Sequence, residues 1–421
     1  MIEATEKTRN GVVSVEEAEG LLVSRALPPG KEVVELSQAL GRTAAEAYVS
    51  PFSMPPFRRA AMDGYAVKTI DTLGASPEQP VLLFVESELK AGQSAEGVQG
   101  FSSERSAVRV FTGSPVPASF DSIIIQERVR RVIGEDGIGV AQIDRPAERG
   151  QHIAEPGKDI PECSLLLKQG KRIGPKEMAL LASFGFERVS VHTKPTVAVL
   201  PIGEELVLPG QPLLPGRIYD SNGFMLEASL KEMGATVRRL PPCADREDEI
   251  ARLIDQAWET ADLVVTTGGV SVGRYDYAKP AAELAGAEPL FTKVLMRPGT
   301  PTSAYARGAK TLIALSGNPS ACFAGLELLV KPYVRKAYGS DSYLNEWESG
   351  VLEEGVSKPC PYPRYIRSRV RPAGGAWSLT PLPNDRSGNI AAFSGAGALA
   401  MIPAGGQGAA AGQSVRWLRL T

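Results

Sequence analysis

The sequence has few histidines, few cysteines and no long apolar run. Only two histidines, His152 and His192, occur, which disfavours a histidine base, a histidine metal site and a catalytic triad. The four cysteines lie far apart without a C-x-x-C pair, a spacing that suits neither a disulfide framework nor a zinc site. No stretch reaches transmembrane length, and the first residues lack the apolar core of a signal peptide. We therefore expect a soluble cytoplasmic protein whose chemistry is carried by carboxylates and backbone amides.

Charge balance and length limit the class of protein further. Lys and Arg number 46 and Asp and Glu number 48, so the net charge of −2 gives no reason to expect nucleic acid or a membrane as a partner. Hydrophobic residues make up 43% and charged residues 22%, as in ordinary globular chains. At 421 residues the chain exceeds one hydrophobic core. We expect about two to four domains.

The first half of the sequence predicts helices around a β-rich insertion. Ser14-Val-Glu-Glu17 is a capping-box pattern that opens the helical run SVEEAEGLLVSRA, and helices are also predicted for Leu36 to Ala47 and for Pro175 to Phe184. From Pro51 to Ile143 the sequence has Pro-rich turns and short β-prone runs. We predict a discontinuous helical domain, residues 1–50 and 146–190, with a small β-domain, residues 51–145, inserted in it.

From Pro195 the pattern changes to alternating strands and helices. The strands TVAVL, ATVRRL, LVVTT and TLIAL alternate with helices at Ser221 to Met233, Glu247 to Trp258 and about Pro319 to Ala337. This predicts a doubly wound α/β domain, residues 191–340. Short strands broken by Pro and Gly (YIRSRV, WSLTPL, ALAMIP and SVRWLRL) then predict a C-terminal β-domain, residues 341–421.

A glycine-rich turn follows the buried-type strand LVVTT. In Thr266-Thr-Gly-Gly-Val-Ser-Val-Gly-Arg-Tyr-Asp-Tyr277, the glycines leave backbone N–H groups open to an anion at the carboxyl end of a strand, with Gly268, Gly269 and Ser271 as candidate phosphate contacts. The turn is no P-loop, because Arg274-Tyr275 follows Gly273 where Lys and Ser/Thr would stand, and it lacks G-x-G-x-x-G. Taken alone, it is equally well explained as a tight turn that needs glycine for its backbone.

A second turn has the same strand-to-helix context. Leu315-Ser-Gly-Asn-Pro-Ser320 places Pro near the first helical position and two serine hydroxyls beside it. The two turns on adjoining strands would form one anion site. Lys293 and Arg297, in KVLMRPG between the turns, could clamp phosphate or another oxyanion, although either cation alone is better explained as a solvated charge. The candidate contacts of this turn are Ser316, Gly317, Asn318 and Ser320.

Carboxylates also gather at turns of the α/β domain. Glu205, Asp220 in IYDSN and Asp276 in GRYDY are hard oxygen ligands of the kind that Mg²⁺ binds beside phosphates. A helix cap or an Asx-turn explains Asp220 equally well. In the first half, Asp63 of MDGYAV and Thr112 of FTGSPVP lie at turns that by themselves indicate nothing more.

Five motifs in order, MDGYAV, FTGSPVP, TTGGVSVGRYDY, KVLMRPGTP and SGNPSA, resemble the molybdopterin molybdotransferases, the family of bacterial MoeA and the gephyrin E domain. The resemblance covers nearly the whole chain. It implies an elongated homodimer of four-domain subunits around a central molybdopterin-binding α/β domain. It also implies that the active cleft forms between the α/β domain of one subunit and the MDGYAV β-domain of the other. The TTGG and SGNP turns alone also occur in the smaller molybdopterin adenylyltransferases.

The resemblance also implies residue roles. Asp63 and Thr112 would face the cleft from the partner subunit, and Lys293 would contact the nucleotide or pterin phosphates. The catalytic carboxylates would be Asp63, Asp159, Glu205, Asp220 and Asp276, of which Glu205, Asp220 and Asp276 would hold Mg²⁺. Molybdate would be bound by Arg297, Pro298, Ser320, Arg367 and Ser387.

Several positions depart from the family pattern. S-T-G-D-E-L is replaced by Pro201-Ile-Gly-Glu-Glu-Leu206, and G-E-D by Gly157-Lys158-Asp159. Thr300 and Arg297 stand where lysines are common, and Ala154 stands where arginine is frequent. None of these changes touches the glycine turns, so the departures concern affinity more than activity.

By this resemblance the chain inserts molybdate into adenylylated molybdopterin with release of AMP, in a Mg²⁺-dependent reaction of molybdenum cofactor biosynthesis. Contacts with the adenylyltransferase and with apo-molybdoenzymes would follow from that role. One alternative is the molybdopterin adenylyltransferase itself, which would consume nucleotide without molybdate. Another is a non-catalytic molybdopterin-binding scaffold, against which the intact acidic positions and the absence of a long linker count.

Overall fold

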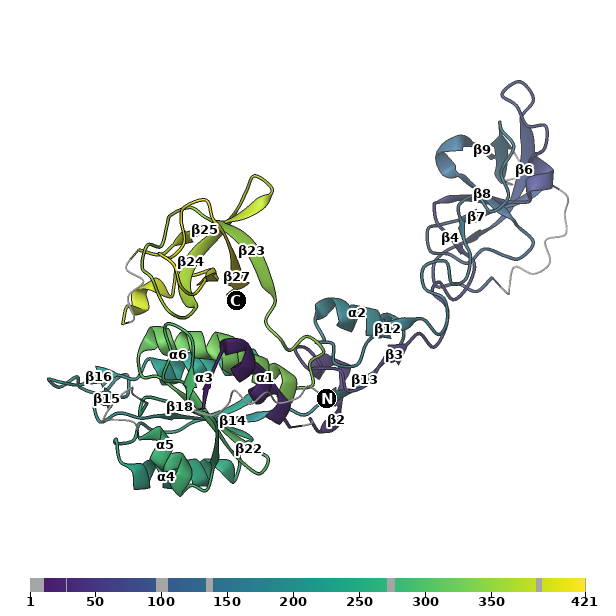
Figure 1. Ribbon diagram of the computed structural model, residues 1–421. Coiled ribbons are helices and arrows are strands. Elements are labelled where there is room, and N and C mark those ends of the chain that lie inside the picture. The colour runs from purple at the N-terminus through teal and green to yellow at the C-terminus, as the bar shows by residue number, and fades with distance from the viewer. Residues whose placement is uncertain are drawn as a thin grey trace, which may run out of the picture. The chain divides into compact units, whose positions relative to one another are not determined.

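The computed structural model describes residues 11–27, 29–95, 105–133, 139–270, 277–383 and 388–420. It divides the chain into two compact units (Figure 1). The smaller unit comprises residues 47–168 and 180–185, and the larger unit comprises residues 1–46, 169–179 and 186–421, so the division falls within α2 (Pro175–Ser183). Over the described ranges, no helix has both the length and the apolar character needed to span a membrane.

The smaller unit is built on a six-stranded sheet with the order β8-β5-β7-β6-β10-β9. Alternation along β5 puts Ala66 in one buried cluster and its neighbours Tyr65 and Val67 in another, so both faces of the sheet are covered. This confirms the predicted β-rich character of the segment. The elements are β5 (Gly64–Val67), η2 (Thr69–Thr72), β6 (Val81–Leu89), β7 (Ser106–Val110), β8 (Ser122–Ile125), η4 (Gln126–Arg128), β9 (Val129–Ile133) and β10 (Gly139–Ile143), with the short pairs β3 (Tyr48–Val49) and β12 (Leu165–Leu167), and β4 (Arg59–Ala60) and β11 (Ile153–Ala154).

The N-terminal helix belongs to the larger unit. The amide of Glu17 donates to Ser14 Oγ at 3.1 Å and the amide of Ser14 donates to Glu17 Oε2 at 2.8 Å, which confirms the predicted capping box of α1 (Val15–Arg25). Ala18 and Leu22 are fully buried against the α/β core. The helix is therefore held by one apolar face rather than by propensity alone.

The prediction of a helix from Leu36 to Ala47 is wrong. The chain instead forms β2 (Lys31–Glu35), a single 3-10 turn η1 (Leu36–Gln38) and then a turn through Gly41, whose φ is +75°. β2 pairs antiparallel with β13 (Arg188–His192). Apolar residues of the predicted helix instead lie beside β13, where Ala44 forms a bridge with Val191. The left-handed turn at Gly41 precedes them.

The larger unit contains the predicted α/β sheet, with the order β17-β14-β18-β22-β21-β19. The first four strands are parallel, and β21 and β19 extend the sheet antiparallel. Short parallel pairs lie beside it. The elements are β14 (Thr196–Pro201), β17 (Thr236–Arg239), β18 (Leu263–Thr267), β19 (Glu288–Phe291), β21 (Ser303–Arg307) and β22 (Lys310–Leu315), with the pairs β1 (Val12–Val13) and β20 (Lys293–Val294), and β15 (Leu206–Val207) and β16 (Ile218–Tyr219).

Helices cover both faces of this sheet (Figure 1). Val197 and Val199 of β14 pack with α3 (Asn222–Glu232), whereas Ala198 and Leu200 pack with α4 (Glu247–Trp258), near α5 (Ala278–Leu284). On the α3 face, α6 (Pro319–Gly325), the π-helical turn η5 (Leu326–Val330) and α7 (Lys331–Ala337) form the predicted long helix. The doubly wound prediction is confirmed.

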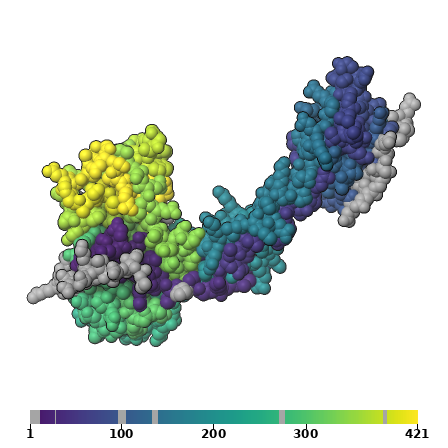
Figure 2. Space-filling model, turned by 45° about the vertical axis from the view of Figure 1, so that its right-hand side comes forward, coloured from purple at the N-terminus to yellow at the C-terminus, as the bar shows by residue number. Residues whose placement is uncertain are grey.

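The C-terminal segment forms a closed five-stranded barrel in the order β23-β25-β24-β26-β27. Tyr365, Leu399 and Leu418 of the barrel share a buried cluster with Leu22 of α1 and Val330, so the barrel packs on the α/β domain. Figure 2 shows the barrel in yellow beside the purple N-terminal helix. The elements are β23 (Trp347–Leu352), β24 (Arg364–Ala373), β25 (Ala376–Pro381), η6 (Ile390–Ala392), β26 (Ala398–Ile402) and β27 (Ser414–Arg419). A multidomain protein with a central α/β domain and β-domains is thereby confirmed.

Candidate functional site

The two predicted anion-binding turns lie against each other. Thr267 of β18 pairs with Leu315 of β22, and the amide of Gly268 donates to the carbonyl of Leu315 at 3.0 Å. Gly268 has a φ of +92°, and a Cβ there would lie 2.0 Å from the carbonyl oxygen of Ile202. A Cβ on Gly317 would lie 3.2 Å from the Cα of Gly268. Both turns therefore need glycine for close backbone approach, and the same glycines bring the two turns together.

Asn222, at the start of α3, bridges the two turns. Its Nδ2 donates to Thr267 Oγ1 at 2.9 Å and to the carbonyl oxygen of Gly317 at 2.8 Å, and the side chain is largely buried. Sequence reasoning missed this residue, because IYDSN was examined only for its aspartate. Its position two residues after Asp220, at a strand-to-helix junction, was the available signal.

Asn318 caps α6. Its Oδ1 accepts from the amide of Ser320 at 3.2 Å, and its own amide donates to Ser316 Oγ at 3.3 Å. Pro319 stands in the first turn of the helix, as predicted. Ser320 is 6% exposed, so the surface of this turn consists mainly of backbone and of Gly317. An anion at this end of the helix would meet backbone N–H groups rather than a row of hydroxyls.

A cavity of about 510 Å³ opens beside these turns, and we call it the turn cavity. Its lining includes Thr267, Gly317 and Pro319 from the turns and Asn222 from α3. It also includes two of the predicted carboxylates, Glu205 and Asp220, and two residues of the C-terminal domain, Gly388 and Ile390. Over the described ranges, neither lysine nor arginine lines this cavity.

Asp220 is the most unusual group at the cavity because it is 1% exposed. Its Oδ1 accepts from the amide of Gly223 at 2.8 Å, so Asp220 does cap the following helix. Its Oδ2 is buried and makes no hydrogen bond with the described residues; Arg239 Nη1 lies 3.6 Å away. Burial raises the pKa of Asp220, against the opposing effects of the Gly223 hydrogen bond and Arg239. The capping explanation therefore accounts for only one of the two oxygens.

Arg239 contacts Glu227, Phe224 and Asp220 at once. Its Nε donates to Glu227 Oε2 at 2.8 Å, and its guanidinium lies 3.8 Å from the ring centre of Phe224. These contacts hold Arg239 beside Asp220 without a direct hydrogen bond between them. The arrangement gives Asp220 a cationic neighbour but leaves Oδ2 available as a ligand atom.

The C-terminal domain reaches the turn cavity through one loop. Arg367 is 2% exposed, and its Nη1 donates to the carbonyl oxygen of Asn389 at 3.1 Å, between Gly388 and Ile390. Its guanidinium also lies 4.7 Å from the ring centre of Phe393. Phe393 in turn stacks on Phe323 of α6 at 5.1 Å. Arg367 thus lies behind the loop that lines the cavity rather than in its lining.

Three other predicted contacts lie outside the lining of the turn cavity: Lys293, Arg297 and Pro298. The loop that carries Arg297 is joined to the barrel, since the amide of Arg297 donates to the carbonyl of Pro363 at 3.0 Å and its carbonyl accepts from the amide of Tyr365 at 2.8 Å. Arg297 is exposed. Arg297 therefore lies at the junction with the C-terminal domain, whereas Lys293 pairs with Val12 of β1.

Asp63 and Thr112 meet within the smaller unit. Asp63 Oδ1 accepts from both the amide and the hydroxyl of Thr112, each at 2.7 Å. These two hydrogen bonds lower the pKa of Asp63. Elsewhere in this unit, Asp159 Oδ2 lies 3.0 Å from Arg59 Nη2 in an exposed ion pair. The smaller unit thus presents a partly exposed carboxylate that stays ionised over a wide pH range.

Three predicted site residues, Ser271, Asp276 and Ser387, lie outside the described residues. Within the described ranges, no group of three or more His, Cys, Asp or Glu side chains is arranged to hold a metal ion. Glu205 and Asp220 line one cavity. The third predicted carboxylate, Asp276, is one of the residues outside the described ranges.

Fold and cavity together define the class of protein: a multidomain α/β protein with a cavity at the carboxyl ends of its parallel strands, beside paired glycine turns. Family models match along the chain. The MoeA N-terminal region (domain I and II) matches residues 13–185, the probable molybdopterin binding domain matches residues 198–336, and the MoeA C-terminal region (domain IV) matches residues 349–420.

Individual relatives cover almost the whole chain. The molybdopterin molybdenumtransferase of Bacillus subtilis is 35% identical over 92% of this chain and 89% of its own length. That of Staphylococcus aureus is 32% identical over 96% and 94%. A molybdopterin biosynthesis MoeA crystal structure from Pyrococcus horikoshii is 31% identical, with a TM-score of 0.79 over 97% of this chain and 99% of that one. The chain belongs to the molybdopterin molybdenumtransferase family and is a transferase of molybdenum cofactor biosynthesis.

Proposed function

We propose that the chain inserts molybdate into adenylylated molybdopterin and releases AMP, in a reaction that requires Mg²⁺. The observation that carries this proposal is the buried Oδ2 of Asp220 beside the two glycine turns, which makes no hydrogen bond with the described residues. Glu205 lines the same cavity. Two carboxylates without a lining lysine or arginine would repel a phosphate, so the cavity suits a phosphate that arrives with a divalent cation.

The residues fit Mg²⁺ in ligand chemistry. Glu205 and Asp220 offer hard oxygen atoms, and Asp276 would supply a third carboxylate by its place in the GRYDY motif. When bound, the metal would offset phosphate charge during cleavage of the phosphoanhydride. The carboxylates of this chain would orient the phosphates, while Arg239 limits the repulsion around Asp220.

The turns and the C-terminal loop would hold the two ends of the substrate. Backbone N–H groups at Gly269 and Gly317 would bind phosphate oxygens, because the amide of Gly268 already donates to the carbonyl of Leu315. The Asn222 bridge would keep the two turns at a fixed spacing. The loop held by Arg367 and Phe393 would close the molybdate side of the cavity, so Arg367 would act through that loop. Lys293, Arg297 and Pro298 would contribute from outside the lining of the turn cavity, and Ser387 by its place in the DRSGNI motif.

The proposal includes a cytoplasmic homodimer in which each active cleft uses both subunits. Asp63 and Thr112 of one subunit would serve the turn cavity of the other. The geometry of Asp63 supports this, because the side chain is partly exposed and both of its hydrogen bonds to Thr112 use Oδ1, which leaves Oδ2 for a ligand outside its own unit. Asp159 would help by fixing Arg59 on the same unit. Delivery of substrate by the adenylyltransferase and transfer to apo-molybdoenzymes would follow.

The experiment is AMP release by purified protein given adenylylated molybdopterin and Mg²⁺, with and without molybdate. The proposal expects AMP release that depends on molybdate, with metal retained on the pterin. Nucleotide consumption without molybdate would indicate the adenylyltransferase reaction instead. Tight binding without release under either condition would leave a molybdopterin-binding scaffold.

A further inference from the structure

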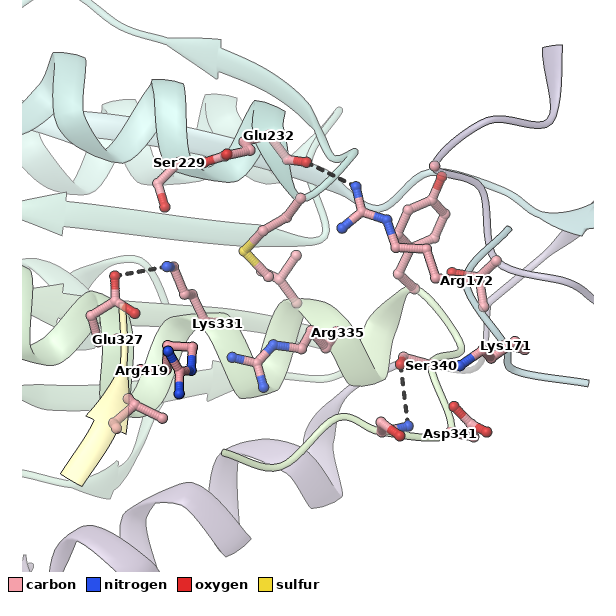
Figure 3. Close-up of a pocket in the computed structure, with 17 residues that line it drawn as sticks. Lys171, Arg172, Ser229, Glu232, Glu327, Lys331, Arg335, Ser340, Asp341 and Arg419 are labelled. Atoms are coloured by element: carbon pink, nitrogen blue, oxygen red, sulfur yellow. Dashed lines mark hydrogen bonds and ion pairs between the residues drawn. The ribbon is translucent and has the colours of Figure 1, made fainter. Parts of the chain in front are cut away.

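A second cavity, of about 490 Å³, lies elsewhere in the larger unit and shares no lining residue with the turn cavity. Figure 3 shows it between the end of α3, the α7 helix and the loop that carries Lys171 and Arg172. Its lining holds five cationic side chains, Lys171, Arg172, Lys331, Arg335 and Arg419, against three carboxylates, Glu232, Glu327 and Asp341. We call it the cation-lined cavity. Its volume is in the range of small-molecule sites.

Two of the five cations have carboxylate partners. Lys331 Nζ lies 2.7 Å from Glu327 Oε1, with both side chains buried, and Arg419 Nη2 lies 3.0 Å from Glu348 Oε1. The carboxylates of Glu327 and Glu348 thus neutralise the charges of Lys331 and Arg419. The remaining three cations, Lys171, Arg172 and Arg335, carry the positive charge of this cavity.

Arg335 is the strongest indication of an anion. Its guanidinium donates to the carbonyl oxygens of Tyr343 at 3.1 Å and Leu344 at 3.0 Å and to Asn345 Oδ1 at 3.0 Å, all of which are uncharged. Within the described part of the chain, no carboxylate forms an ion pair with Arg335. Burial lowers its pKa, although more distant acidic groups oppose that effect. A partly buried guanidinium whose hydrogen-bond partners are all uncharged favours an anion beside it.

The loop that carries Lys171 and Arg172 is fixed at several points. The amide of Ala44 donates to the carbonyl of Lys171 at 3.0 Å, and the amide of Asp341 donates to the carbonyl of Gly170 at 3.0 Å. Gly170 has a φ of +81°, and a Cβ there would lie 2.9 Å from the amide nitrogen of Asp341. Arg172 itself makes one long bond, 3.3 Å, to the carbonyl of Glu232. Both cations are thus presented from a fixed backbone, and the described residues around them use few of their donors.

The rest of the lining suits a small ligand with a polar and an apolar end. Ser229 and Ser342 offer hydroxyl groups, whereas Met233, Val334 and Leu418 form an apolar wall. The exposed carboxylates of Glu232 and Asp341 would reduce the attraction for a free monoanion. A dianionic group held by three cations overcomes that repulsion more readily than a single charge does.

From this arrangement we infer that the cation-lined cavity binds a small molecule carrying a phosphate group, whose oxygens contact Lys171, Arg172 and Arg335. The ligand connects the loop at residues 170–172 with α7. It is independent of the molybdopterin site, because the two cavities share no lining residue.

The test uses inorganic pyrophosphate as the probe, titrated by calorimetry into the full-length protein. Lys171→Ala with Arg172→Ala should weaken one pyrophosphate site at least ~10-fold, since two charge-assisted contacts are lost. The matched control is Lys176→Ala with Lys194→Ala, which removes the same charge from two exposed lysines outside the cavity. The control should bind as the wild type does.

Three outcomes would overturn the inference. They are an absence of pyrophosphate binding, an equal loss in the control, and a site that survives the double substitution but disappears in Asn222→Ala. AMP release by the Lys171→Ala, Arg172→Ala protein is measured in parallel and should remain at the wild-type rate. A failure of this inference can therefore be told apart from a failure of the molybdate-insertion proposal, which the AMP assay reads by itself.

Discussion

Glu327 and Asp220 are both buried carboxylates of the larger unit, 4% and 1% exposed, and burial raises the pKa of each. Their partners differ. Lys331 lies 2.7 Å from Glu327, whereas Asp220 Oδ2 makes no hydrogen bond with the described residues and its neighbour Arg239 is 3.6 Å away. A buried carboxylate in close contact with a cation is satisfied within the structure, whereas a buried carboxylate oxygen that has only a longer ion pair indicates where a ligand belongs.

The largest effect is expected on the paired side of this comparison. Lys331→Met should lower the free energy of unfolding by about 3–5 kcal/mol at neutral pH, because Glu327 loses its buried partner. Below pH 4.5, the ordinary glutamate pKa, the carboxyl is protonated in both states and the loss should be small. The loss of stability should grow as the pH rises through the folded-state pKa of Glu327, which burial raises. Urea unfolding of the wild type and of Lys331→Met at several pH values measures the difference in their free energies of unfolding.

The control for Lys331→Met is Lys231→Met. Lys231 and Glu227 form a pair with the same spacing and the same 2.7 Å distance, but Lys231 is 56% exposed. Its loss should cost less than about 0.5 kcal/mol. Equal losses in the two variants would show that burial does not distinguish the pairs.

The next largest effect is expected on the unpaired side. Asp220→Asn should slow molybdate-dependent AMP release at least ~10²-fold, as should Asp276→Ala, because a carboxylate that orders a catalytic metal is removed. Stability should change little in Asp220→Asn, since the new side chain still offers an acceptor to the amide of Gly223. Glu204→Gln, an exposed neighbour outside the cavity, is the control. Wild-type turnover in Asp220→Asn would return this residue to a purely structural role.

A smaller effect is expected at the bridge between the turns. Asn222→Ala should lower the free energy of unfolding by about 1–3 kcal/mol and kcat/KM by roughly tenfold, because the carbonyl of Gly317 and the hydroxyl of Thr267 lose their donor. Chemical unfolding measures the free energy of unfolding, and the AMP assay measures kcat/KM. Gln256→Ala, at an exposed position of α4 outside the turn cavity, should leave both unchanged. An unaltered kcat/KM in Asn222→Ala would show that the spacing of the turns is not critical.

The smallest effect is expected at the loop from the C-terminal domain. Phe393→Ala removes the ring between Arg367 and Phe323. The free energy of interaction lost with the ring pair is about 0.5–1.5 kcal/mol. Since the loop lines the turn cavity, this should appear mainly as a higher KM for molybdate, with kcat preserved. Phe57→Ala, an exposed ring of the smaller unit, is the control. A fall in kcat with KM unchanged would contradict a positioning role.

Most of the fold could be predicted because its signals are local. The Ser14 capping box, the amphipathic run Glu247–Trp258 and the strand-turn-helix patterns at Gly268 and Gly317 each depend on neighbouring residues, and the structure confirms them. The predicted helix from Leu36 to Ala47 failed because β2, which precedes it, pairs with β13 more than 150 residues later. Sequence periodicity carries no information on that partner.

The candidate site could be predicted in its motifs but not in its contacts. The adjoining turns were expected, because consecutive parallel strands place their carboxyl ends together. The Asn222 bridge, the burial of Arg367 and the distance of Arg297 from the cavity lining depend on side-chain packing between segments far apart in sequence. Such packing determines which charged groups reach a cavity, and no local pattern reports it.

The most direct measurement is a crystal structure of the wild-type protein with adenylylated molybdopterin and Mg²⁺ in the absence of molybdate, a condition in which AMP release should not occur. The account predicts substrate phosphates on the Gly268 and Gly317 turns, with metal density at Asp220 Oδ2. Substrate phosphates bound away from both turns, with no metal density at Asp220 Oδ2, would contradict it.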